Sequence, residues 1–352
     1  MNIDIRLPRQ RIEGPSAWVG AELAKQPQTW TYSLAPREIA EIEEATKGVA
    51  GRDIASIRRE DFPLPTLGPV LERLRGEVLN GRGFVLVRGL PVEGRPIAVN
   101  AAAYWGIGCY FGNARSQNAK GHVLGHVRDL GLSSKDPNVR IYLTTERQNF
   151  HTDSCDIVAL LCLHPAKSGG LSSLTSSMSI YNAMAEQRPD LLARLFIPFA
   201  TDRRGEVPEG KKPWFDIAVF NEYEGHISAM YAPHYVRSSQ RFAQARRLTA
   251  EDIEALDMFD RLAEDPTLRL DMALRAGDMQ FVHNHTLLHD RTAFEDWPEP
   301  ERKRHLLRLW LAAPGARPLP PAYAERYGSV TIGDRGGIIC PGARLHAPLE
   351  PA

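Results

Sequence analysis

The sequence is poor in cysteine and has no long apolar run, and each absence excludes a class of protein. Its four cysteines, Cys109, Cys155, Cys162 and Cys340, form no Cys-x-x-Cys pair and no dense framework, which favours reduced thiols. No stretch approaches the roughly 18 uninterrupted apolar residues of a membrane span, and the polar start lacks a secretory signal. We therefore predict a cytoplasmic protein with no membrane partner.

The sequence also lacks net charge. Lys plus Arg and Asp plus Glu number 43 each, so no basic excess indicates a nucleic-acid partner. The loops GxGxxG and GxxxxGK[ST], which bind nucleotide phosphates, are missing as well. These absences argue against a nucleic-acid partner and a nucleotide-phosphate loop, and they leave a homo-oligomer open.

Short apolar segments dominate the chain after residue 122, and clusters of Gly, Pro, Asn, Asp and Ser separate them. This pattern is typical of a sandwich or jelly roll. Helical patterns at 177–195 and 249–265 interrupt the strands without βαβ alternation, which disfavours a doubly wound sheet. We predict an α+β, mainly β fold with a double-stranded β-helix (jelly-roll) core and flanking helices. One domain is expected over residues 1–352, made of a peripheral segment (1–60), a core (80–312) and a C-terminal wrap (313–352).

Histidine and aspartate lie close together in the stretch NFHTDSCDI, residues 149–157. In an extended strand, His151 and Asp153 point to the same face, so both side chains could reach one metal ion. Three more histidines, His283, His285 and His289, follow an apolar strand, and spacing alone does not choose among them. Two imidazoles and one carboxylate form the facial triad of non-haem Fe(II) oxygenases, which leaves three coordination positions open.

Arginine punctuates an apolar strand in ERKRHLLRLWLAA, at Arg304 and Arg308. A cation within a sheet needs an anionic partner, and Arg binds a carboxylate with a bidentate fork. A 2-oxo acid could fill two metal positions and leave the third for O2. The distal carboxylate of 2-oxoglutarate would then need an arginine some distance from the metal.

On these residues the chain resembles the taurine dioxygenase family (TauD/TfdA-like, clavaminate synthase-like) of Fe(II)/2-oxoglutarate-dependent oxygenases. The resemblance covers roughly residues 80–312, which it implies to be the catalytic core. The matching motifs are FHTD, SGGLSSL, HNHTLLHDR and RHLLRLWL, in the expected order.

The resemblance implies a role for each matching residue. His151, Asp153 and His289 match the iron ligands, which leaves His283 and His285 outside the set. Ser172 and Arg304 match the residues that hold the distal carboxylate of 2-oxoglutarate. Arg308 falls where related enzymes have a second arginine near the cosubstrate or the substrate.

The expected function is therefore an oxidoreductase that uses Fe(II), 2-oxoglutarate and O2. It would hydroxylate an unactivated C–H bond of a small, carboxylate-bearing substrate and release succinate and CO2. Desaturation, cyclisation and epimerisation use the same cofactors and stay open, as do a zinc hydrolase and a non-catalytic jelly-roll binding protein. The Gly-rich segment 333–348 is either a lid over the site or a surface connection.

Overall fold

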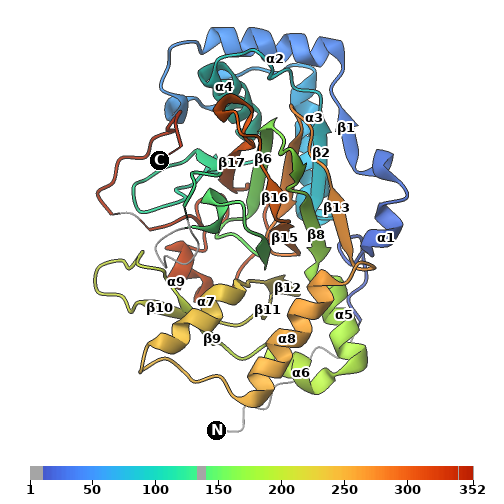
Figure 1. Cartoon of the computed structure of the whole chain (residues 1–352), viewed down its shortest axis with the longest axis vertical. Helices are drawn as coiled ribbons and strands as arrows, with labels where there is room; N and C mark the ends of the chain where they lie inside the picture. The colour runs from blue at the N-terminus through green and yellow to red at the C-terminus, as the bar shows by residue number, and fades with distance from the viewer. Residues whose placement is uncertain (1–10, 133–139, 340, 352) are drawn as a thin grey trace.

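The computed structural model describes residues 11–132, 140–339 and 341–351. Figure 1 shows strands from distant parts of the chain gathered in the middle, with helices above and below them. The larger sheet has seven strands, of which only β1 and β2 are shown parallel and the other pairs are antiparallel. In spatial order it runs β1 (Thr31–Ser33), β2 (Phe84–Arg88), β14 (Met279–His283), β6 (Ile157–His164), β17 (His305–Ala312) and β3 (Asn113–Ala114), with β4 (Gly125–Arg128) also paired to β17.

A smaller antiparallel sheet has four strands, in the order β13 (Arg269–Met272), β8 (Ser172–Ser176), β15 (Leu287–Arg291) and β5 (Gln148–His151). Three two-stranded pairs accompany it: β9 (Phe199–Asp202) with β10 (Trp214–Ile217), β11 (Phe220–Tyr223) with β12 (His226–Ala229), and β7 (Ser168–Gly169) with β16 (Phe294–Glu295).

Strand β6 is buried on both faces, so its side chains belong to two separate apolar layers. Its sequence IVALLCLH is a nearly continuous apolar run, as expected of a strand buried on both faces. Ile157 and Leu161 pack with the helix side of the larger sheet, whereas Val158 and Cys162 join Leu174 of the smaller sheet. The second layer is the core between the sheets, and the candidate site lies at its edge.

Helices cover the outer faces of both sheets. The larger sheet packs against α2 (Pro36–Gly48), α3 (Leu67–Asn80) and α4 (Ile97–Gly108). The smaller sheet packs against α5 (Ser177–Gln187), α6 (Pro189–Arg194) and α8 (Ala250–Glu264), which lie together at the lower end of Figure 1. The predicted start of α8 is confirmed, because Thr249 Oγ1 accepts a hydrogen bond from Asp252 N. The remaining short helices are α1 (Gly20–Leu23), α7 (Pro233–Ser238) and α9 (Ala324–Tyr327).

Both ends of the described chain take part in the packing. Strand β1 extends the larger sheet, Ile42 of α2 lies in its core, and Arg335 near the C-terminus is fully buried. One of the short apolar segments after residue 122, which together predicted strands, is not a strand: the described part of VRIYLTT forms a 3-10 turn at Ile141–Leu143. This turn lines the cavity described below, where Tyr142 packs on a buried arginine rather than in a sheet.

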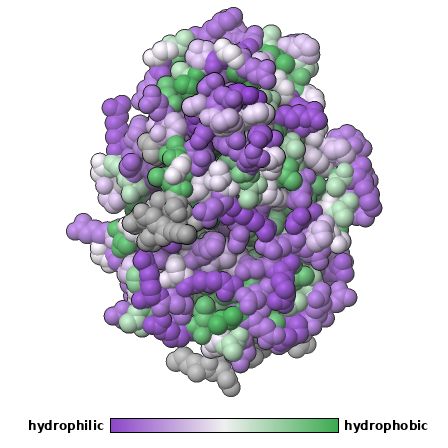
Figure 2. Space-filling view, viewed as in Figure 1, coloured by the Kyte–Doolittle hydropathy of each residue, from purple (hydrophilic) through white to green (hydrophobic). Residues whose placement is uncertain are grey.

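Hydrophilic residues predominate on the face of the molecule that Figure 2 shows, and hydrophobic ones form small separate patches. Among the described helices, none is both long and apolar enough to cross a membrane. The mixed sheets with covering helices agree with the α+β part of the predicted fold.

Candidate active site

His151, Asp153 and His289 lie together at one end of the space between the sheets. His151 ends β5, Asp153 follows in the next loop, and His289 is the residue of β15 that pairs with His151. Asp153 Oδ1 lies 3.7 Å from His151 Nε2, and Asp153 Oδ2 lies 3.6 Å from His289 Nε2. A metal ion bound at about 2.0–2.2 Å with right angles between donors would separate them by roughly 3 Å. The three side chains could therefore hold a metal ion on one face of an octahedron, with only small shifts.

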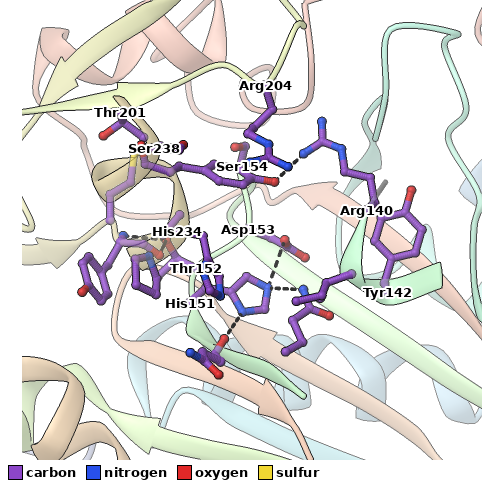
Figure 3. A pocket seen from close by; sticks show the side chains of 18 of the residues that line it. Arg140, Tyr142, His151, Thr152, Asp153, Ser154, Thr201, Arg204, His234 and Ser238 are labelled. Atoms are coloured by element: carbon purple, nitrogen blue, oxygen red, sulfur yellow. Dashed lines mark hydrogen bonds and ion pairs between the residues drawn. The ribbon is translucent and has the colours of Figure 1, made fainter. Parts of the chain in front are cut away.

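The imidazole of His151 is oriented for metal binding. Its Nδ1 donates a hydrogen bond to the carbonyl oxygen of Asn149, 2.8 Å away, so Nε2 keeps its lone pair. The amide nitrogen of Gln148 lies 2.9 Å from that Nε2. Figure 3 shows the ring of His151 facing Asp153, with a dashed line between them. Burial, and then the neighbouring His289, lower the pKa of His151 to about 3. The ring is therefore neutral at pH 7, which is the form that ligates metals.

The carboxylate of Asp153 is held in its charged form. Burial opposes the charge, but Arg308, His289 and His151 outweigh it and keep the pKa of Asp153 well below its usual range. Trp310 Nε1 donates to Asp153 Oδ2 at 2.7 Å, and Arg308 Nη1 lies 3.5 Å from the same oxygen. The other oxygen thus remains the freer one for a metal ion.

The two competing histidines point away from this cluster. Strand β14 ends at His283 and β15 begins only at Leu287, so the intervening turn resets which residues face inward. His283 Nδ1 lies 2.9 Å from Thr286 Oγ1, and His285 Nε2 lies 3.0 Å from Asp156 Oδ1. Both rings are buried, and within the described residues the cluster that could hold a metal contains His289 alone of the three.

Arg304 and Ser172, which the family resemblance assigns to 2-oxoglutarate, are both buried polar residues. Ser172 Oγ donates to Gln280 Oε1 at 2.9 Å, and both residues are buried. Arg304 is 4% exposed, and its Nη1 has no hydrogen-bond partner among the described residues. Burial lowers the pKa of Arg304 to about 10, so it stays charged. No ion pair joins Arg304 to a carboxylate among the described residues, so this buried cation could bind an anion such as the distal carboxylate of 2-oxoglutarate.

Glycine at position 170 makes room for this arginine. Gly170 has a φ of +64°, in the left-handed region, and a Cβ there would lie 3.0 Å from Arg304 Nε and 3.3 Å from the Cβ of Phe294. The SGG turn of the sequence motif thus has two physical reasons for glycine.

A cavity of about 620 Å³ opens on His151 and Asp153. Arg308 lines this cavity, whereas Arg304 and Ser172 do not. The two arginines therefore face different parts of the site. Arg308 Nε donates to Gln117 Oε1 at 2.8 Å, which fixes the side chain at the cavity wall. Ile338 also lines the cavity, so the Gly-rich tail contributes part of the wall.

Basic side chains gather at the other end of the cavity, and sequence reasoning did not find them. Arg140 Nη2 lies 2.6 Å from Glu206 Oε1, and its Nη1 donates to the hydroxyl of Tyr235. Arg326 lies 3.7 Å from Glu206 Oε2. Figure 3 shows Arg140 and Arg204 pointing toward each other across this end. The guanidiniums of Arg140 and Arg326 both lie against the single carboxylate of Glu206, so positive charge exceeds negative charge in this group, and we call this the basic end of the cavity.

Comparison with known proteins agrees with this geometry. A family model described as "Taurine catabolism dioxygenase TauD, TfdA family" matches residues 46–310. The chain is 32% identical over 335 residues to FR-33289 synthase of Streptomyces rubellomurinus, covering 92% of this chain and 97% of that protein.

Solved structures share the fold at low identity. An asparagine oxygenase in complex with Fe(II), hydroxyasparagine and succinate superposes with a TM-score of 0.61 at 16% identity, over 80% of this chain and 93% of that one. The non-haem iron oxygenase OrfP, in complex with Fe and α-ketoglutaric acid, gives a TM-score of 0.60 at 14% identity, over 80% and 93%. The chain thus belongs to the TauD/TfdA family and is an Fe(II)- and 2-oxoglutarate-dependent dioxygenase.

Proposed function

We propose that His151, Asp153 and His289 hold the iron, and that the enzyme hydroxylates a small anionic substrate bound in the adjoining cavity. The observation that carries this proposal is the approach of three donor atoms to within 4.8 Å of one another, beside the cavity. Bound iron, 2-oxoglutarate and O2 supply the oxidising chemistry, with succinate and CO2 released. An aspartate at position 153 disfavours halogenation, because related halogenases carry a small residue there.

The protein's own part is to place the reactants. We propose that Arg304 and Ser172 hold the distal carboxylate of 2-oxoglutarate in the enclosed space between the sheets. Trp310 and Arg308 would keep Asp153 charged and oriented. The substrate then approaches from the cavity side, separated from the cosubstrate carboxylate, and the buried walls exclude bulk water from the reacting bond.

The cavity supports an anionic substrate with a carboxylate or a similar group. Arg308 stands near the metal end, and Arg140 and Arg326 stand at the basic end with Glu206 between them. About 620 Å³ is ordinary for a small-molecule site. The asparagine oxygenase and OrfP structures hold hydroxylated amino acids, which favours hydroxylation over desaturation, cyclisation or epimerisation here.

The remaining expectations belong to the same proposal. We propose that the two sheets form a double-stranded β-helix within one domain over residues 1–352, and that the enzyme acts in the cytoplasm on a small molecule. Nucleic acid is not a partner in this proposal, and a homo-oligomer stays open.

Succinate release tests the proposal. Purified protein with Fe(II), 2-oxoglutarate and ¹⁸O2 would be incubated with amino acids and other small carboxylic and phosphorylated acids, and products read by mass spectrometry. We expect one ¹⁸O atom in succinate and one in the product for at least one acid. Asp153→Ala should abolish both, and Asp190→Ala, at an exposed surface ion pair, should change neither. Equal succinate from the enzyme and Asp153→Ala would refute the ligand assignment.

A further inference from the structure

Arg291 is a buried arginine that the function proposed above does not use. It ends β15, two residues after His289, so its side chain leaves the strand on the same face as that imidazole. Across the sheet it pairs in register with Ser172, the residue proposed to contact 2-oxoglutarate. The backbone therefore aims Arg291 into the space between the sheets, beside Ser172.

The guanidinium of Arg291 is incompletely satisfied. The residue is 6% exposed, and its Nε and Nη1 have no hydrogen-bond partner among the described residues. Its Nη2 donates to the backbone carbonyl oxygen of Glu146. Buried guanidinium groups normally use all their donors, so two idle N–H groups indicate that an acceptor is missing.

Arg291 also shares its surroundings with Arg304. The guanidinium carbon of Arg291 lies 4.8 Å from the ring centroid of Phe294, and that of Arg304 lies 5.2 Å from the same centroid. Asp290, the neighbouring carboxylate, points to the opposite face of β15 and pairs with Arg147 at 2.8 Å. Two like charges thus lie close together in a buried region, with idle donors on both. Such a pair is strongly destabilising unless an anion joins it.

We propose that Arg291 is a second guanidinium for the distal carboxylate of 2-oxoglutarate, acting beside Arg304 and Ser172. This inference rests on the proposed function, because it requires 2-oxoglutarate to bind between the sheets. The carboxylate would receive the idle N–H groups of both arginines and offset their repulsion. The consequence is selectivity for a dicarboxylic 2-oxo acid over one with an uncharged end.

A merely structural role for Arg291, holding the Glu146 carbonyl, predicts something different. Loss of that bond would disturb the site for any 2-oxo acid, whether or not it has a distal carboxylate. Comparing 2-oxoglutarate with 2-oxopentanoate separates the two roles, because the second compound has the same chain length and the same metal-binding end but no distal charge.

The experiment is anaerobic isothermal titration of the Fe(II)-loaded protein with each of these acids, for the unaltered enzyme and for Arg291→Gln. We expect the variant to bind 2-oxoglutarate roughly 10- to 100-fold more weakly, the range for one lost charge-assisted hydrogen bond, with 2-oxopentanoate affinity within about twofold. Arg302→Gln, at a partly exposed arginine stacked on Trp297, is the matched control and should change neither.

Arg291→Lys is a second test in case the glutamine variant misfolds. Lysine keeps the positive charge but cannot bind a carboxylate with two parallel hydrogen bonds, as a guanidinium does. We expect it to lose part of the 2-oxoglutarate affinity and none of the 2-oxopentanoate affinity. Equal weakening of both acids, or no weakening of either, would overturn the inference. If the unaltered protein bound no 2-oxoglutarate, the proposed function itself would fail, which is a distinguishable result.

Discussion

Removing one hydrogen bond to Asp153 should weaken the iron site without dismantling it. Trp310 Nε1 donates to Asp153 Oδ2 at 2.7 Å, and the indole is 5% exposed within the core between the sheets. Trp310→Phe keeps an aromatic ring there but removes the donor. The affected oxygen would retain two more distant neighbours, Arg308 Nη1 at 3.5 Å and His289 Nε2 at 3.6 Å.

The magnitude follows from the charge of the acceptor. A hydrogen bond to a charged group contributes about 1.5–3 kcal/mol, which corresponds to roughly 10- to 100-fold in affinity. Outer contacts of metal ligands show the same range of about 10–100-fold when they are mutated. We therefore expect the Fe(II) dissociation constant to rise by roughly 10- to 100-fold, whereas 2-oxoglutarate affinity at saturating metal should hardly change.

The effect would be measured by anaerobic isothermal titration calorimetry of the metal-free protein with Fe(II). Trp297→Phe is the matched control, because Trp297 stacks on an arginine outside the candidate site and should leave iron affinity unchanged. Melting curves of the metal-free proteins would show whether the loss of indole volume matters. Unchanged iron binding in Trp310→Phe, with the fold intact, would show that this contact does not support a metal ligand.

Three further predictions concern turns, pH and the tail. Gly170→Ala should weaken 2-oxoglutarate binding, because the new methyl group would crowd Arg304, which we propose binds the cosubstrate. Gly210→Ala, with a φ of +70° but open space around it, should cost only backbone strain of about 1–2 kcal/mol. Burial lowers the pKa of His305 to about 3, so the unfolded chain takes up a proton near pH 6.5 that the folded chain resists. Stability in urea should therefore fall as pH drops from about 6.5 toward 3, and His305→Gln should reduce that slope by up to about 1.4 kcal/mol per pH unit. Arg335→Gln should lower the free energy of unfolding by about 3–5 kcal/mol, because it removes the ion-pair partner of the buried Asp156. The exposed Arg344→Gln should change it very little, and equal melting temperatures of the two variants would contradict this prediction.

Sequence could predict the parts of the site whose residues lie close together in the chain, because strand periodicity then fixes which side chains share a face. His151 and Asp153 lie two residues apart at the end of a strand, and the arginines recur within one apolar strand. The choice of His289 over His285 needed the family resemblance, because three histidines at even spacing look alike on a regular strand. The turn between β14 and β15 interrupts the alternation of side chains along the strand, and spacing in the sequence did not predict this turn.

The basic end of the cavity could not be predicted, because its members come from unrelated segments. Arg140 precedes a 3-10 turn that was expected as a strand, Arg204 follows β9, and Arg326 belongs to α9 near the C-terminus. These three segments lie far apart in the sequence, so only the fold brings the arginines together. Sequence spacing does not predict the pairing of Arg291 with Arg304 either. The two residues belong to different segments, and the fold places both guanidiniums near the ring of Phe294.

The loop that carries Asp153 depends on residues nearly two hundred positions away. Arg326 Nε donates to Ser154 Oγ at 2.9 Å, the amide of Gly337 donates to the Ser154 carbonyl at 2.6 Å, and Arg335 pairs with Asp156 at 2.8 Å. The tail thus contacts the chain on the C-terminal side of Asp153, the proposed metal ligand, and Asn284 Oδ1 accepts a hydrogen bond from the backbone amide of Asp153 at 2.9 Å. A ligand on a short loop needs such support to keep its geometry without the metal. The tail is therefore better understood as a support for the proposed metal site than as a surface connection.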